Sequence, residues 1–385
     1  MASTPMGVAA RSEAPLRYRT IGNFLVPHSA AAEAWYWQHL HRQQHLPRRS
    51  WLARWQPGAG QAVPWAAQEQ ARLSELLGGA VQCIWRPAAP GISRATLAWL
   101  VEDHRLRAVA RTARGPHCSF LEREWDALRH LEQVPGLAAS TPGLLWAERE
   151  AGAGEEQRRL LLLESACEGE AVAPWRAEAP SHAAASWLAG FQFSAAARAP
   201  YSPIALLAAL AAQPRAAAFP GTPVALTAFA RERLRVRALS APAAPRVPAH
   251  GDYWWGNVLL GGAGEISVVD WSEFRLDMHP YHDPGFYLLT WGRDWAQRRR
   301  RLPPATWLRL AFVPGSRFLM LAARWFDAYR AALARAAWSR GLEPDFNALL
   351  RYLPVVMAHY ACHGQQAAAW TAACNTWAAS DGLVF

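Results

Sequence analysis

The order of strand-like and helix-like segments most restricts how this chain folds. Short β-type runs lie at 80–85, 95–102 and 106–111, and two more, at 143–149 and 158–165, flank a glycine-rich turn. One helical pattern at 119–133 interrupts them, and helical patterns dominate after residue 165. Strands followed by helices predict an α+β fold with two lobes, a small antiparallel-sheet N-lobe and a larger, mainly helical C-lobe.

The first 78 residues precede the strand-rich region and carry two helical patterns, at 30–43 and 64–77. Pro64 stands at the first turn of the second pattern, where proline is favoured. We therefore expect a helical extension at 1–78, an N-lobe at 79–164 and a C-lobe at 165–385. Five tryptophans of the extension are expected to pack rather than to bind a ligand: Trp35, Trp37, Trp51, Trp55 and Trp65.

The chain contains no lysine, so all 40 basic residues are arginine, and the formal net charge is +10. With its abundant alanine, glycine and proline, this composition is typical of GC-rich coding, so the charge alone does not indicate a function. A basic surface attracts anions, yet no helix-turn-helix, zinc-finger or RNP signature accompanies it, and nucleic-acid binding is not expected. Five scattered cysteines without CxxC spacing suit a reducing cytoplasm, and no apolar run is long enough to span a membrane.

Three polar residues surround a glycine turn in the stretch 250–271. The sequence HGDYWWGNVLL begins at His250, and the turn GGAG at 261–264 separates it from ISVVDW, which contains Asp270. Asp252 and Asn257 are five residues apart, the offset of the Asp and Asn in the kinase catalytic loop. A hairpin at the glycines would return Asp270 to Asn257, giving two oxygen ligands for one Mg²⁺. The alternative is that Asp252 caps a turn and Asp270 merely ends a strand.

HGDYWWGNVLL and VVDW resemble the aminoglycoside phosphotransferase and choline kinase family, whose fold is protein-kinase-like. The resemblance covers about residues 80–365. It implies ATP and Mg²⁺ as cofactors, Asp252 as the catalytic base, and Asn257 and Asp270 as Mg²⁺ ligands. His250, which we place with Asp252 at the catalytic site, steadies the loop in that family; a packed core histidine is the alternative. The resemblance also implies that Asp283 anchors this loop, and its neighbour Pro284 favours an N-cap.

Weaker matches to the family lie upstream, in the N-lobe. Gly91 and Ser93 resemble the turn that covers the nucleotide phosphates, although an ordinary β-turn reads the same. Glu164 and Ser165, at the end of a leucine run, resemble the hinge whose backbone binds adenine. A buried strand that reaches a loop is the alternative for this run.

The family expects a lysine where Arg111 stands, paired with a helix glutamate. Glu124 matches that glutamate better than Glu122 does. Arginine is a wide planar fork and no simple replacement for lysine, so Arg111 is the main departure from the family. We expect Arg111 to contact the phosphates; Arg114 or Arg94 could do so instead.

The resemblance implies transfer of phosphate to a hydroxyl of a small molecule such as a sugar, an amino alcohol or a related metabolite. Arginines outnumber carboxylates after residue 276, which argues against a polycationic aminoglycoside. The run at 298–301 is a solvated loop or a clamp for an anionic acceptor. A non-catalytic kinase fold that binds nucleotide or regulates a partner is the alternative function, and Arg111 is the feature that favours it.

Overall fold

The computed structural model describes the chain in two compact units. Unit 1 comprises residues 1–118 and 145–166, and unit 2 comprises 119–144 and 167–385. The described residues are 16–21, 23–40, 61–88, 95–152, 154–167, 169–171, 178–194, 201–212, 225–241, 243–297, 302–335, 344–363, 367–380 and 383. No helix among them is long and apolar enough to cross a membrane.

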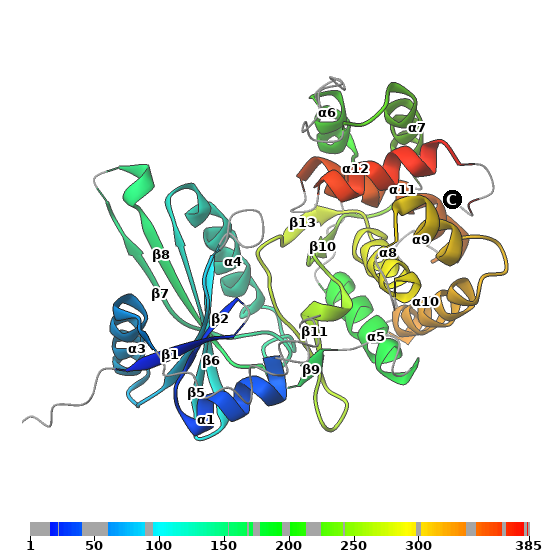
Figure 1. Cartoon of the computed structure of the whole chain (residues 1–385). Coiled ribbons are helices and arrows are strands. Elements are labelled where there is room, and N and C mark those ends of the chain that lie inside the picture. Colours follow the sequence, from blue (N-terminus) through cyan, green and yellow to red (C-terminus); the bar gives the residue numbers. More distant parts are fainter. Residues whose placement is uncertain are drawn as a thin grey trace, which may run out of the picture. The chain divides into compact units, whose positions relative to one another are not determined.

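Unit 1 is built on one sheet, which has eight strands among the described residues, in the order β3-β1-β2-β4-β5-β6-β8-β7 (Figure 1). All pairings from β3 to β8 are antiparallel. The strands are β1 Arg17–Ile21, β2 Phe24–Pro27, β3 Gln61–Ala62, β4 Gln82–Arg86, β5 Thr96–Glu102, β6 Arg105–Arg114, β7 Leu144–Glu150 and β8 Arg159–Ser165. Asp103 and His104, both at positive φ, form the tight turn between β5 and β6.

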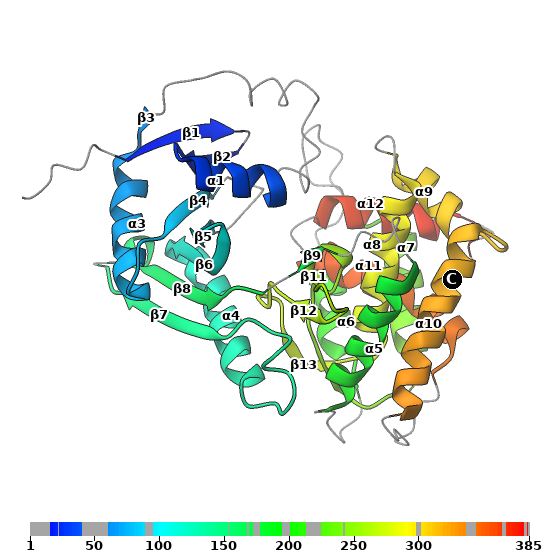
Figure 2. The ribbon, with the colours of Figure 1, turned by 90° about the horizontal axis from the view of Figure 1, so that it is seen from below.

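Helices cover both faces of this sheet (Figure 2). Helix α3 (Pro64–Leu77) buries Ala66 and Leu73 with alternate residues of β4, β5, β6 and β8. On the other face, α1 (Ala30–Trp35) and the π-helical turn that follows it, Tyr36–Leu40, pack Trp35 and Tyr36 against Phe24. Ser29 caps α1 by accepting from the backbone N–H of Ala32.

The N-terminal segment differs from the helical extension that its sequence predicts. Helix α3 has the expected bounds, but three strands, β1 to β3, also form here and join the sheet of unit 1. Trp35 is buried and Trp37 is partly buried in the core, whereas Trp65 is exposed and lies edge-on to Trp85. Trp51 and Trp55 lie outside the described residues.

Unit 2 is mainly helical, with short strands before and within the stretch 250–271 and just after it (Figure 1). Helices α8 and α11 pack against each other, α10 lies along α5, and α12 packs on α11. The helices are α4 Cys118–Leu131, α5 Glu178–Ser194, α6 Ile204–Ala212, α7 Ala228–Leu239, α8 His282–Ala296, α9 Pro304–Ala311, α10 Arg317–Arg335, α11 Phe346–His363 and α12 Ala367–Ala378. The strands are β9 Glu170–Ala171, β10 Val247–Ala249, β11 Val258–Leu260, β12 Ile266–Val268 and β13 Arg275–Met278. The two-lobed fold class is confirmed.

Candidate active site

The loop that carries Asp252 begins where β10 ends, and its first turn requires glycine. Gly251 has φ +80°, and a Cβ at this position would lie 2.0 Å from the carbonyl oxygen of Glu273. A side chain here would therefore strain the backbone and overlap another segment. The close approach holds the start of the loop against the segment that follows Asp270.

His250 joins this loop to the end of the β11–β12 hairpin. Its Nδ1 accepts from the backbone N–H of Asp252 at 3.2 Å, which places the ring proton on Nε2, 3.0 Å from the carbonyl oxygen of Val269. The ring is fully buried, 4.5 Å from the ring of Trp271. Since each ring nitrogen bonds with a backbone group, His250 positions the backbone of Asp252 and that of Val269, which precedes Asp270.

Asp283 anchors the same loop from the first turn of α8. Its Oδ2 accepts from the N–H of His250 at 2.7 Å, and its Oδ1 accepts from the N–H of Gly251 at 3.1 Å. The expected N-cap role is wrong, because Tyr281 is the N-cap and Asp283 lies inside the helix. Burial raises the pKa of Asp283 to about 7, against the lowering effect of the two N–H groups.

Asn257 is fixed against Asp252. Its Nδ2 donates to the carbonyl oxygen of Asp252 at 3.0 Å and to Oδ2 of the same residue at 3.2 Å. Because the amide nitrogen bonds with Asp252, Oδ1 is the atom of this buried side chain that can ligate a metal.

The hairpin of β11 and β12 returns the chain to this point. Val258 pairs with Val268, and the N–H of Val269 donates to the carbonyl of Asn257 at 3.0 Å, so Asp270 follows directly. Asp270 adopts φ +70°, which is rare for a residue with a side chain. The hydroxyl of Ser272 donates to Asp270 Oδ1 at 3.2 Å.

Negative charge is concentrated around Asp252. Burial raises its pKa well above the ordinary value, and the nearby carboxylates of Asp270 and Glu273 raise it further. The described residues contain no group of three or more His, Cys, Asp or Glu side chains that could hold a metal ion. One amide and one carboxylate still fit Mg²⁺, which is commonly held by one or two carboxylates together with substrate phosphates. A cation here would also relieve the repulsion among the carboxylates.

Two residues of α4 hold the segment after Asp270. The buried Glu124 accepts from the backbone N–H of Trp271 at 3.1 Å, and Nε of Arg123 donates to the carbonyl of Ser272 at 3.2 Å. Arg111 belongs to unit 1 and Glu124 to unit 2, so their pairing stays a prediction. The sequence motifs missed Arg123 because a backbone contact leaves no pattern in spacing.

In unit 1, Arg111 and Glu164 form an ion pair. Nε of Arg111 lies 2.9 Å from Oε1 of Glu164, and both side chains are almost fully buried. Glu164 was expected to act at the hinge through its backbone, so this side-chain contact was not foreseen. Ser165, the last residue of β8, pairs with Ala108.

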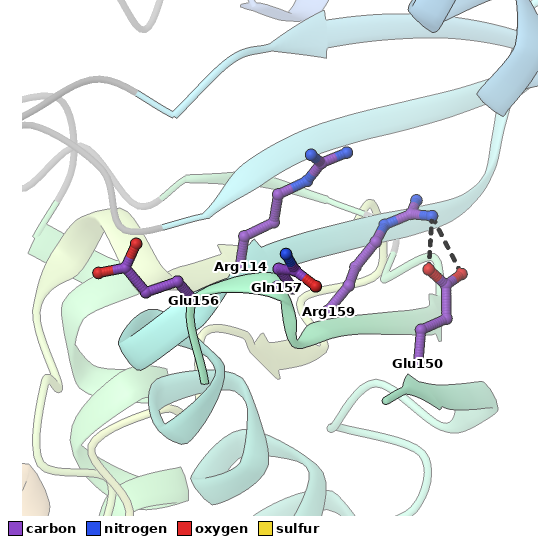
Figure 3. Close-up of a pocket in the computed structure, with 5 residues that line it drawn as sticks. All are labelled: Arg114, Glu150, Glu156, Gln157 and Arg159. Carbon is purple, nitrogen blue, oxygen red and sulfur yellow. Dashed lines mark hydrogen bonds and ion pairs between the residues drawn. The ribbon is translucent and has the colours of Figure 1, made fainter. Parts of the chain in front are cut away.

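Other expected residues lie apart from this pair or outside the described residues. Gly91, Ser93 and Arg94 are outside them. Arg114 lies directly opposite Arg159 on the α3 side of the sheet, where both line a pocket of about 310 Å³ (Figure 3). The alternation of side chains along β6 places Arg114 on the face opposite Arg111.

The aromatic residues at the start of α8 and along α8, α11 and α12 are mostly in the core. Tyr281, Tyr287, Tyr360, Trp291 and Trp370 are buried, and Trp295 is partly buried. The hydroxyl of Tyr360 donates to the carbonyl oxygen of Gly251, a contact that the sequence did not reveal.

Two half-buried tryptophans, Trp254 and Trp255, stand two and three residues after Asp252. The ring of Trp254 covers Gly256, where a Cβ would come within 2.4 Å of that ring. Nε1 of Trp255 donates to Asp294 of α8 at 2.8 Å.

No family model matches the chain, and no curated protein does. Among solved structures, choline kinase LicA from Streptococcus pneumoniae is similar, with a TM-score of 0.47 and 12% identity over 82% of this chain and 92% of that one. A thermostable mutant of aminoglycoside phosphotransferase APH(4)-Ia, in a ternary complex with ADP and hygromycin B, has a TM-score of 0.46 and 16% identity over 81% and 99%. Spectinomycin phosphotransferase APH(9)-Ia, with ADP and spectinomycin, has a TM-score of 0.44 and 11% identity over 86% and 97%. These are the kinds of protein that the sequence motifs resemble.

Proposed function

We propose that this chain is an ATP-dependent phosphotransferase that moves the γ-phosphate of ATP to a hydroxyl group of a small molecule. The observation that carries the proposal is the arrangement of one loop and one hairpin. Asn257 is hydrogen-bonded to Asp252. The hairpin pairs the backbone of Val269 with that of Asn257, and Asp270 is the next residue. A base and two oxygen ligands at fixed spacing are what phosphoryl transfer to a hydroxyl requires.

Each residue has a distinct part in this proposal. Asp252 orients the acceptor hydroxyl and accepts its proton, and a raised pKa makes its carboxylate a stronger base. Oδ1 of Asn257 and the carboxylate of Asp270 hold Mg²⁺, which neutralises phosphate charge when it is bound. Arg111 contacts the nucleotide phosphates. His250 and Asp283 transfer no proton and keep the loop in place.

The acceptor is proposed to be a sugar, an amino alcohol or a related metabolite. Trp254 and Trp255 offer half-buried aromatic surface two and three residues after the base, and such surface stacks on the apolar face of a ring or on a cation.

ADP formation from MgATP with a panel of sugars, amino alcohols and sugar phosphates tests the proposal. An acceptor that raises ADP formation above the rate in water, with phosphate recovered on its hydroxyl, is the expected result. If MgATP binds and no hydroxyl compound is phosphorylated, the non-catalytic kinase fold accounts for the chain better.

A further inference from the structure

We infer that Glu164 is a positioning residue for Arg111, and that it holds the guanidinium where the nucleotide phosphates bind. The inference rests on the proposed function, because it requires a nucleotide in this unit. It assigns to the side chain of Glu164 a part that the expected hinge contact, made by the backbone, does not include.

The register of two neighbouring strands brings the two residues together. Arg111 of β6 stands opposite Leu162 of β8, and Glu164 stands opposite Val109. Residues two apart on a strand point to the same face, so Arg111 and Glu164 are diagonal neighbours on one face of the sheet. The 2.9 Å between Nε and Oε1 is a direct ion pair between them.

The burial of this pair calls for an explanation other than stability. The Arg111 side chain is 8% exposed and that of Glu164 is 3% exposed. Two charges buried to this extent lose hydration, and a buried ion pair often stabilises a fold no more than apolar side chains of similar size would. A charged pair on an otherwise apolar strand face is therefore better explained by a ligand that needs the cation.

The contact also accounts for arginine at this position. Nε is the inner nitrogen of the guanidinium, whereas the outer amino groups carry four of its five N–H donors. Arginine can thus be held from one side by Glu164 while its outer end meets phosphate oxygens. Lysine has a single nitrogen, which would have to meet the carboxylate and the phosphate from one point.

A partly buried arginine, Arg159, provides a matched control. Nη2 of Arg159 lies 2.6 Å from Oε2 of Glu69, and their side chains are 12% and 20% exposed. Arg159 also pairs with Glu150 beside the pocket of Figure 3. This network lies on the α3 face of the sheet, opposite Arg111, so it shares the chemistry of the Arg111–Glu164 pair without sharing its face.

The experiment measures binding of MgADP and of adenosine by calorimetry to the full chain. The variants are Glu164→Gln, Arg111→Lys, their double variant and the control Glu69→Gln. Adenosine lacks the phosphates, so its binding reports on the integrity of the site that holds the adenine ring. We expect Glu164→Gln to weaken MgADP about tenfold while adenosine changes less than about twofold. In the Arg111→Lys background, Glu164→Gln should weaken MgADP binding further by less than about twofold.

Three results would overturn the inference. Tighter MgADP binding by Glu164→Gln would mean that the carboxylate only repels the phosphates. An equal loss of affinity for MgADP and for adenosine would mean that Glu164 acts on adenine binding or on the fold. No change, or the same change in Glu69→Gln, would mean that the pair has no part in binding. If the wild-type chain binds neither MgADP nor MgATP, the proposed function itself fails, which is a separate outcome.

Discussion

Nδ2 of Asn257 donates both to the backbone carbonyl of Asp252 and to its carboxylate. One amide thus fixes the orientation of the proposed base and directs its own oxygen away from it. The positions of the proposed base and of the proposed metal ligand are therefore fixed relative to each other within a loop of six residues.

Replacing Asp252 by asparagine keeps the shape of the side chain and removes the base. We expect the rate of acceptor phosphorylation to fall about 10²- to 10⁴-fold. Binding of MgATP should change little, because Asp252 is not assigned to the metal. Asp294→Asn, which alters a carboxylate bonded to Trp255, should retain far more activity. Undiminished turnover by Asp252→Asn would refute the assignment.

Gly251→Ala should destabilise the chain more than Gly264→Ala. Both glycines have positive φ, but a Cβ on Gly251 would overlap the carbonyl of Glu273, whereas one on Gly264 meets nothing within 4 Å. Backbone strain alone costs about 1–3 kcal/mol, so the second variant should stay within that range and the first should exceed it. Denaturant titrations measure both, and equal losses would contradict the close approach.

The stability of Asp283→Asn relative to wild type should depend on pH. The folded pKa of Asp283 is about 7, above the unfolded value of about 3.9, so the folded state binds the proton more tightly. The stabilising contribution of this proton is complete below about pH 4 and is lost as the pH rises through about 7. As the pH rises over this range, the free energy of unfolding of Asp283→Asn should therefore increase relative to that of wild type, by at most about 4 kcal/mol.

Free energies of unfolding at a series of pH values, with wild type and Asp283→Asn in parallel, give this difference. If wild type instead becomes more stable relative to the variant as the pH rises, the effect of the backbone N–H groups outweighs that of burial, and the pKa of Asp283 lies below its ordinary value.

Tyr360→Phe removes one buried hydroxyl that bonds to Gly251. Tyr329→Phe is its matched control, since that hydroxyl donates to Oε1 of Gln192, outside the loop. Each variant should lose about 0.5–1.5 kcal/mol of unfolding free energy. Only Tyr360→Phe should also lower turnover, because it releases the backbone next to Asp252. Equal activity in the two variants would show that the contact does not position the base.

The sequence indicated most of the sheet because its central strands pair with strands that are close to them in the sequence. β4, β5 and β6 are marked by short apolar runs and a tight turn, and α3 and α4 by helical spacing. β1, β2 and β3 were missed because they are short, and because only the pairing of β1 with β2 is local. Leu25 of β2 meets Trp85 of β4, sixty residues later, and spacing along the chain does not reveal such pairs.

The sequence places Asp252, Asn257 and Asp270 near one another because one loop and one hairpin carry them. The family resemblance assigns Glu124 to Arg111, and that pairing stays a prediction, whereas the contact of Arg111 with Glu164 was not foreseen. The register of β6 and β8 places Glu164 beside Arg111, and only the paired strands reveal that register. Asp283 was misread as a cap because α8 begins one residue before it.

The most direct test of the account is the binding of ATP with and without Mg²⁺ by the wild-type chain and by Asp270→Ala. A ligand that binds only the folded state raises the melting temperature as its concentration exceeds its dissociation constant. We expect ATP to raise the melting temperature of the wild type more with Mg²⁺ than without it, and this increment to vanish in Asp270→Ala. If no nucleotide shifts the melting temperature of the wild type, or if Asp270→Ala keeps the full Mg²⁺ increment, the proposed site is wrong.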